Sequence, residues 1–591
     1  MKLFHLIGSY RYFILGFILL LFLVARAILV PPLHDEIATL FYFVETGDIL
    51  NDFTNLDANN HLFNSYLGRL LYLLFEPNLF VYRLPNILAF LLFFYSSIQI
   101  FKGITDKKTQ FLAVFALSAT PFILEYFALT RGYGLGMSFM LFMLVKLNQW
   151  LTENSFSSLV FALFTGLLSV FSNLVFLNSF LITLGIVFLF LVYNYRKINL
   201  RSLIVNFSIL ILAFILVLPL VNFGMKLRAS KALYYGDLTS FWEVTGSSLS
   251  KMLFQTDHYL IKYTLLLFVF GILSYVLFKS RRFMFNIKHN ICFLMSIFFV
   301  GNLIAVFLLA LIFNVNYPED RAAIYLVVLG IPILAYAVHS NRIRGLFIIL
   351  LIFPILFLFN LNFTHALVTP DQHLQKTFYN KVRAESINHP VTIYPTQHLA
   401  WAYYERNQSQ KKLVSSSKTV SDVSDFYISR PPYSDGLESF EVLFQEKISN
   451  SKALERINKF KTELLYEKEF QSTEKHDEYI NIDKIATTEQ LNNCIIDIEI
   501  KGSLKLETNY KHCSLVFDAT YEDGSNYYNA YPFHWYYSPK NSNFEFEVIQ
   551  RLPKREGLKN IKLYIWNKFN RNIKFIKGKY ELRRIITNGT R

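Results

Sequence analysis

Three residues that could take part in acid–base chemistry stand together near the N-terminus. His34, Asp35 and Glu36 follow directly after the first apolar run and Pro31-Pro32. A carboxylate can act as a general base when burial and neighbouring groups set its pKa. Successive side chains on a helix point about 100° apart, so we expect one carboxylate to be the base and the other to bind substrate or to hold the first in place. The alternative is structural, because acidic residues also stabilise the first turn of a helix.

Four further polar clusters stand at the ends of apolar runs. They are Asp57, Asn59, Asn60 and His61; Glu125, Arg131 and Tyr133; Lys226, Arg228 and Lys231; and Glu319, Asp320 and Arg321. Arginine can hold a phosphate with two hydrogen bonds, whereas asparagine and histidine suit a polyhydroxylated ligand. Each cluster also has a structural explanation, such as a helix cap, an interfacial anchor or a snorkelling side chain.

Long apolar runs dominate the part of the chain that contains these clusters. The chain has 591 residues, 53% of them hydrophobic, and a mean hydropathy of +0.33. Runs of about 18 or more apolar residues are typical of membrane helices. About eleven occur, at 12–30, 79–101, 109–127, 132–150, 156–173, 174–194, 203–222, 261–278, 291–313, 322–338 and 346–363. The sequence therefore predicts a polytopic α-helical membrane protein, followed by a soluble C-terminal domain.

The distribution of Lys and Arg predicts the orientation of the membrane part. Basic residues gather in alternate short loops, such as 102–108, 196–201 and 279–288, and such loops usually face the cytoplasm. We expect the first run to be a retained helix rather than a cleaved signal peptide. Loops 31–78 and 223–260 and the C-terminal domain then lie outside.

Loop 31–78 has amphipathic patterns that predict two surface helices. The alternative for its second pattern, 61–75, is the start of a longer membrane span.

Beyond the predicted membrane domain (1–363), the pattern changes twice. Residues 364–484 mix strand-like pieces ("VTIYP", "DFYIS") with helical ones ("QHLAWAYYERN", "LESFEVLFQEKI"), which predicts an α/β region. Residues 485–591 carry short alternating strands typical of a β-sandwich. Cys494 and Cys513 lie in this outer part, where a disulfide could form.

Several function classes find no support in the sequence. It has no Cys/His spacing of a metal site, no phosphate-binding loop and no hydrolase elbow. The net charge of +15 is explained largely by the inner loops, so we do not expect a nucleic-acid partner. We predict no metal site and no cofactor, although the carboxylate pair beside His34 could hold a divalent cation.

The order of the polar motifs resembles that of the GT-C superfamily of membrane glycosyltransferases. The similar stretches are "HDE" after the first run, "NNHLFNSYLGRL", "YRLPNIL", "LTRGYGLGMSFML" and "YPEDRAAIYL", which together cover residues 1–363. The end of the chain, "NIKLYIWNKFNRNIKFIKGKYEL", looks like a carbohydrate-binding jelly roll. Lys577 and Gly578 stand where such modules carry an acidic residue, which argues against calcium or sugar binding there.

The resemblance implies a glycosyltransferase of the bacterial inner membrane, with its C-terminal domain in the periplasm. Its donor would be a polyprenyl-phosphate-linked sugar and its acceptor a glycan, lipid or protein, with inversion at the sugar. Asp35 stands at the position of the general base, assisted by Glu36. The expected substrate contacts are His34, Asn60, His61, Glu125, Arg131, Tyr133, Lys226, Arg228, Glu319 and Arg321. The rival functions are a transporter, flippase or polymerase of lipid-linked glycans, or a non-catalytic sensor.

Overall fold

The computed structural model describes most of the chain as two compact units. The described residues are 2–50, 56–76, 78–233, 235–340, 345–419, 424–433, 437–475, 477–486, 491–506, 513–536, 543–568 and 573–586. One unit, here the helical unit, comprises Met1–Val30 and Asp48–Val368. The other, here the C-terminal unit, comprises Pro31–Gly47 and Thr369–Arg591. The segment that carries Asp35 therefore packs with the C-terminal residues rather than with its neighbours in sequence.

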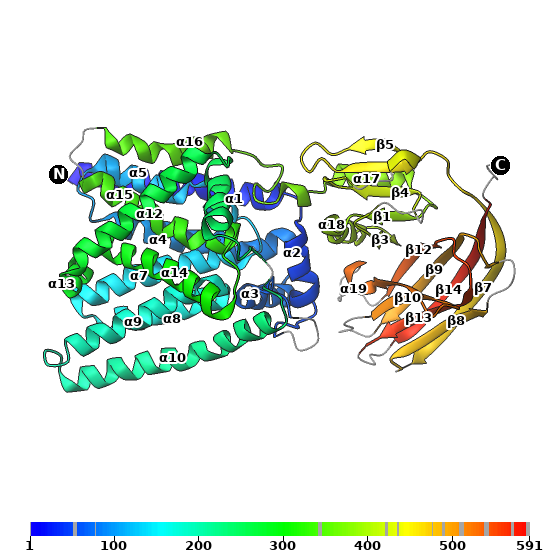
Figure 1. The fold of residues 1–591 in the computed structure, drawn as a ribbon, viewed down its shortest axis with the longest axis horizontal. Coiled ribbons are helices and arrows are strands. Elements are labelled where there is room, and N and C mark those ends of the chain that lie inside the picture. Colours follow the sequence, from blue (N-terminus) through cyan, green and yellow to red (C-terminus); the bar gives the residue numbers. More distant parts are fainter. Residues whose placement is uncertain are drawn as a thin grey trace. The chain divides into compact units, whose positions relative to one another are not determined.

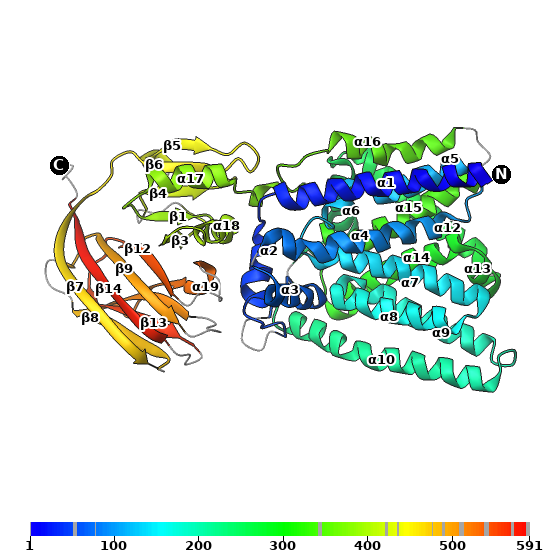
Figure 2. The same cartoon turned by 180° about the vertical axis from the view of Figure 1, so that it is seen from behind.

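The helical unit consists of apolar helices that lie side by side, with α10 along one edge and α16 along another (Figures 1 and 2). Its larger helices are α1 (Lys2–Leu29), α4 (Leu79–Phe101), α5 (Lys107–Ser118), α7 (Gly132–Glu153), α8 (Phe156–Ser172), α9 (Leu177–Tyr193), α10 (Leu200–Ala229), α12 (Tyr259–Ser280), α14 (Ile291–Phe313) and α15 (Ile324–Ser340). The shorter elements are α3 (Leu62–Leu74), α6 (Pro121–Glu125), η2 (Leu174–Phe176), η3 (Trp242–Gly246), α11 (Ser247–Phe254), α13 (Phe283–His289), η4 (Asp320–Ala323), η5 (Leu346–Leu351) and α16 (Ile352–Phe359).

Each predicted membrane run coincides with helix. Among the described residues, seven helices are long and apolar enough to cross a membrane, and Phe156–Ser172 and Leu346–Phe359 are shorter apolar helices. The run 109–127 is interrupted, because α5 ends at Ser118 and Pro121 begins α6. The predicted fold class, a multi-pass helical membrane protein with a sheet-rich C-terminal part, is confirmed.

Helix α3 is the second amphipathic element predicted in loop 31–78. It has 13 residues and ends at Leu74, before α4 begins at Leu79. About 20 residues are needed to span a bilayer, so the alternative that 61–75 begins a longer span is wrong. Its apolar side chains Leu70 and Leu73 are exposed while Asn64 is buried. An exposed apolar face on a short helix fits a position along the membrane surface.

The C-terminal unit begins with a small α/β layer. Its five-stranded sheet has the order β3-β1-β4-β6-β5. The elements are α2 (His34–Thr39), η1 (Leu40–Val44), η6 (Pro370–Gln372), α17 (Lys376–Glu385), β1 (Val391–Ile393), α18 (Pro395–Glu405), β3 (Ser415–Ser416), β4 (Phe426–Ser429), η7 (Leu437–Ser439), β5 (Phe440–Gln445) and β6 (Lys452–Arg456).

The predictions for this layer are confirmed with one exception. "VTIYP" and "DFYIS" contain strands β1 and β4, and "QHLAWAYYERN" overlaps helix α18. The helix predicted for "LESFEVLFQEKI" is wrong, since this stretch forms β5 and pairs with β6. Phe440 is buried against Tyr427 of β4 and Leu454 of β6, so packing within the sheet outweighs the helical spacing.

Two further sheets follow, with strand orders β11-β10-β13-β8 and β2-β12-β9-β14-β7. Their elements are β2 (Gln410–Leu413), β7 (Lys461–Lys475), β8 (Tyr479–Ala486), β9 (Ile496–Leu506), β10 (Cys513–Tyr521), β11 (Asn526–Pro532), α19 (Phe533–Tyr536), β12 (Asn543–Leu552), β13 (Leu558–Asn567) and β14 (Ile573–Ile586). Gln550 of β12 bonds to Tyr527 and Tyr531 of β11, which joins the two sheets. Strands β2 and β7 precede residue 485, so both predicted C-terminal regions contribute to these sheets.

Candidate active site

The three residues of the His34–Glu36 cluster form the first turn of α2. The side chain of Glu36 turns back, and its Oε2 accepts a hydrogen bond from Leu33 N at 3.3 Å. Glu36 is fully buried and Asp35 is 8% exposed. Glu36 thus stabilises the start of the helix that carries Asp35, and a part for either carboxylate in the reaction stays a prediction.

In the helical unit, Asn60 and His61 lie in the turn before α3. They differ in their hydrogen bonding. Asn60 is satisfied locally, because its Nδ2 donates to Ile49 O at 2.7 Å and its Oδ1 accepts from Ser65 Oγ at 2.9 Å. His61 is the N-cap residue of α3 and is 4% exposed. Its Nε2 has no hydrogen-bond partner in the part of the chain that the structure describes. His61 is therefore available to a ligand in a way that Asn60 is not.

Arg131 lies at the start of α7, beside this turn. Its side chain is buried, and its Nη2 donates to Asn59 Oδ1 at 3.0 Å. Tyr133 packs edge-on against the His61 ring, with 5.1 Å between the ring centres. Burial lowers the pKa of His61 well below its usual range, and the charge of Arg131 lowers it further. The imidazole is consequently neutral at physiological pH.

Arg321 reaches the same group from η4, nearly 200 positions further along the chain. It is 7% exposed, its Nη2 donates to Tyr235 OH at 2.8 Å, and its guanidinium lies 4.7 Å from the centre of that ring. The charge of Arg321 is a further cause of the low pKa of His61. The charges of two buried arginines therefore both act on His61.

A pair of asparagines fixes the elements that carry these residues. Asn86 of α4 donates through Nδ2 to Asn64 Oδ1 of α3 at 2.9 Å, and its Oδ1 accepts from Leu135 N of α7 at 3.1 Å. This bond lies near the start of α7, which begins at Gly132. The pair could not be predicted from the sequence, because Asn64 and Asn86 are 22 positions apart and each is only an amide within an apolar pattern.

The other predicted contacts lie in different surroundings. Glu125 pairs with Arg26 at 2.5 Å, with both side chains almost fully buried, and it also accepts from Leu367 N. Arg228, at the end of α10, has its guanidinium 5.6 Å from the Phe313 ring centre, and Lys226 is exposed. Glu319 is the N-cap residue of η4 and is partly exposed.

The described residues contain no group of three or more His, Cys, Asp or Glu side chains placed to hold a metal ion. Cys494 and Cys513 are free thiols, so the disulfide that their location would allow is not formed. Burial raises the pKa of both thiols.

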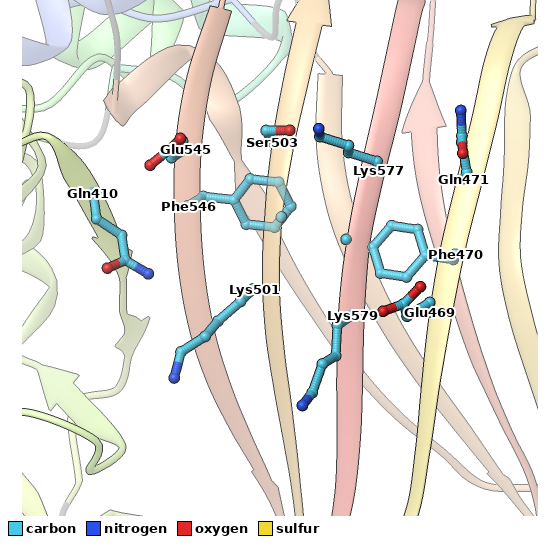
Figure 3. A pocket seen from close by; sticks show the side chains of 12 residues that line it. Gln410, Glu469, Phe470, Gln471, Lys501, Ser503, Glu545, Phe546, Lys577 and Lys579 are labelled. Carbon is cyan, nitrogen blue, oxygen red and sulfur yellow. The ribbon is translucent and has the colours of Figure 1, made fainter.

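A separate groove of about 530 Å³ crosses β12, β9, β14 and β7 in the C-terminal unit (Figure 3). One row of its lining contains Glu545, Ser503, Lys577 and Gln471, and a second contains Lys501, Lys579 and Glu469. Gly502 and Gly578 face each other between the rows. Lys501 and Lys579 are paired with carboxylates of the same sheet, so the groove offers hydrogen-bonding groups rather than one strong charge.

Gly132 allows the close approach of α7 to the turn before α3. A Cβ atom at this position would lie 2.0 Å from Ser172 O and 2.7 Å from His61 Cβ. We expect Gly132→Ala to lower the free energy of unfolding by about 3 kcal/mol or more, because the obstacle is backbone. Thermal unfolding in detergent measures this. Gly185→Ala is the matched control, since no atom lies within 4 Å of its Cβ position, and an equal loss in both variants would contradict the assignment.

No protein family model matches the chain, and no curated protein matches it. Solved structures are similar at low identity. ArnT from Cupriavidus metallidurans, in the apo state and bound to undecaprenyl phosphate, has a TM-score of 0.39 and 11% identity, over 76% of this chain and 98% and 97% of ArnT. Arabinosyltransferase EmbB from Mycobacterium smegmatis has a TM-score of 0.33 and 11% identity, over 97% of this chain and 64% of EmbB.

Proposed function

We propose that the chain is a membrane glycosyltransferase that moves a sugar from a polyprenyl-phosphate-linked donor to a hydroxyl or amine of an extracytoplasmic acceptor. The observation that carries the proposal is the group of Arg131, Arg321 and His61 in the helical unit, where both arginines are buried and both act on the histidine. The charge distribution of the loops supports an extracytoplasmic position for the C-terminal unit.

The leaving group of this reaction is a polyprenyl phosphate. Its negative charge grows as the bond between the anomeric carbon and the phosphate oxygen breaks, and preorganised cations stabilise that charge. Arg131 and Arg321 are the proposed cations. His61, which is neutral, can exchange hydrogen bonds with a sugar hydroxyl without adding charge.

The nucleophile is an acceptor hydroxyl or amine, which needs a base. Asp35 takes its proton while the acceptor atom bonds to the anomeric carbon. A single displacement of this kind inverts the configuration at that carbon. Glu36 supports the reaction by capping the helix that carries Asp35.

For the remaining predicted contacts we propose roles outside the chemical step. Glu125 and Asn60 are held by protein partners, so we propose that they maintain the fold around the site. Tyr133 orients the His61 ring by edge-on packing. Lys226 and Arg228, near the end of α10, suit lipid head groups at the membrane boundary, and a contact of His34 or Glu319 with the acceptor stays a prediction.

A transporter of lipid-linked glycans is less well supported. Ionisable residues within membrane spans mark transport pathways when they line a cavity. Arg26 instead pairs with Glu125, and Arg83 donates to the backbone oxygens of Ala27 and Val30. Both arginines therefore have structural partners.

The proposed function is tested with the full chain in lipid nanodiscs. A panel of undecaprenyl-phosphate-linked sugars is supplied together with envelope extracts as acceptors. We expect release of undecaprenyl phosphate with one donor, and a mass increase of one sugar in an extract component. Release of no lipid phosphate from any donor, together with movement of the sugar lipid across the bilayer when the chain is reconstituted in closed liposomes, would favour the transporter.

A further inference from the structure

One arginine of the C-terminal unit joins three distant segments. Arg406, at the end of α18, donates from Nη1 to Glu45 Oε1 at 2.8 Å. Its Nε donates to Trp535 O at 2.9 Å and its Nη2 to His534 O at 2.8 Å. All three side-chain nitrogens thus donate hydrogen bonds. One of these bonds is to Glu45, at the end of the helical segment that carries Asp35 and Glu36.

The same arginine also covers the aromatic face of that segment. Its guanidinium carbon lies 3.8 Å from the centre of the Phe41 ring, and Phe41 is almost fully buried. Tyr42 contacts α19 as well, with its ring centre 6.1 Å from that of Trp535. The segment is therefore joined to α18 and α19 by an ion pair, by hydrogen bonds and by ring contacts, all of which lie around Arg406.

The held segment is a single stiff piece of chain. Helix α2 runs directly into the π-helical turn η1, so the backbone is helical from His34 to Val44. Helix α2 packs against α18. The side chains of Glu45 and Arg406 are 3% and 10% exposed, so water screens their attraction only weakly. A restraint at Glu45 is consequently transmitted along the helix to Asp35.

We propose that Arg406 is a positioning residue for the base of the transferase, fixing helix His34–Val44 to α18 and α19. This inference rests on the proposed function, because it concerns the orientation of Asp35. It also gives the C-terminal unit a direct part in the reaction, separate from any ligand that its groove takes.

The test compares variants of the full chain in nanodiscs. Arg406→Gln is expected to lower kcat about 100-fold, as misplacement of a reacting group does, and to leave the Kd for undecaprenyl phosphate unchanged. Hydrogen exchange of amides 37–45 should accelerate at least about tenfold. Arg406→Lys should recover part of kcat, because a lysine can pair with Glu45 but cannot also bond to both carbonyl oxygens.

Two further variants keep the test decisive. Glu45→Gln removes the pair from the other side and should reproduce the loss of kcat if Arg406→Gln does not fold. Arg383→Gln breaks a comparable pair with Glu405, which lies outside the segment, and should keep the wild-type kcat. Wild-type kcat in Arg406→Gln and Glu45→Gln, or an equal loss in Arg383→Gln, would overturn the proposal. If Asp35→Asn retains turnover, the proposed base is wrong, while hydrogen exchange still decides whether Arg406 holds the segment.

Discussion

Asp35→Asn is expected to lower the turnover by about 10²–10⁴-fold and to leave the binding of undecaprenyl phosphate unchanged. Asparagine has nearly the same shape as aspartate but cannot accept the acceptor's proton, and general bases contribute rate factors of this size. Turnover is measured as release of undecaprenyl phosphate from the donor that the panel identifies, and binding by titration of the lipid phosphate into nanodiscs.

Two comparisons make this result specific. Glu36→Gln keeps an oxygen that can accept the hydrogen bond from Leu33 N, so its loss should be clearly smaller than that of Asp35→Asn. Glu385→Gln replaces an exposed carboxylate of the same unit and should behave as the wild type. Turnover near the wild-type value in Asp35→Asn would exclude Asp35 as the base.

Arg321→Gln is expected to weaken the binding of undecaprenyl phosphate by about 10- to 100-fold. A hydrogen bond to a charged group contributes about 1.5–3 kcal/mol, and Arg321 is buried where water screens little of its charge. Glutamine can still donate to Tyr235 OH, so the local structure should persist. The measurement is the Kd in nanodiscs.

The control for Arg321 is a basic residue away from the proposed phosphate. Arg196 is exposed in the turn after α9, and Arg196→Gln should leave the Kd unchanged. An unchanged Kd in Arg321→Gln would rule out its part in phosphate binding, whereas equal weakening in both variants would indicate a general effect of net charge.

The elements of the fold were largely predictable, because their signals are local. Apolar runs locate the membrane helices, and alternation locates β9, β10, β12, β13 and β14. The stretch that became β5 was not predictable in this way, since its partner β6 decided its conformation. Strand β7 lies at the edge of its sheet and is mostly polar, so its pattern is weak.

The composition of the candidate site was predictable, but its internal organisation was not. Arg131, Arg321 and His61 were identified from residue type and position near the ends of apolar runs, and in the structure both arginine charges lower the pKa of His61. The partners that occupy Glu125 and Glu45 are about 100 and 361 positions away in sequence. No local pattern distinguishes a carboxylate that is paired within the protein from one that contacts a substrate.

The interleaving of the two units has a consequence for biosynthesis. Glu45 leaves the ribosome 361 residues before Arg406, a delay of about 20–70 s at ordinary rates of translation. During that time the helix with Asp35 has none of its holding partners, and α19 arrives later still. A nascent chain can thus insert its helices before Arg406 and α19 hold this segment, so the segment reaches its final position only when synthesis is nearly complete.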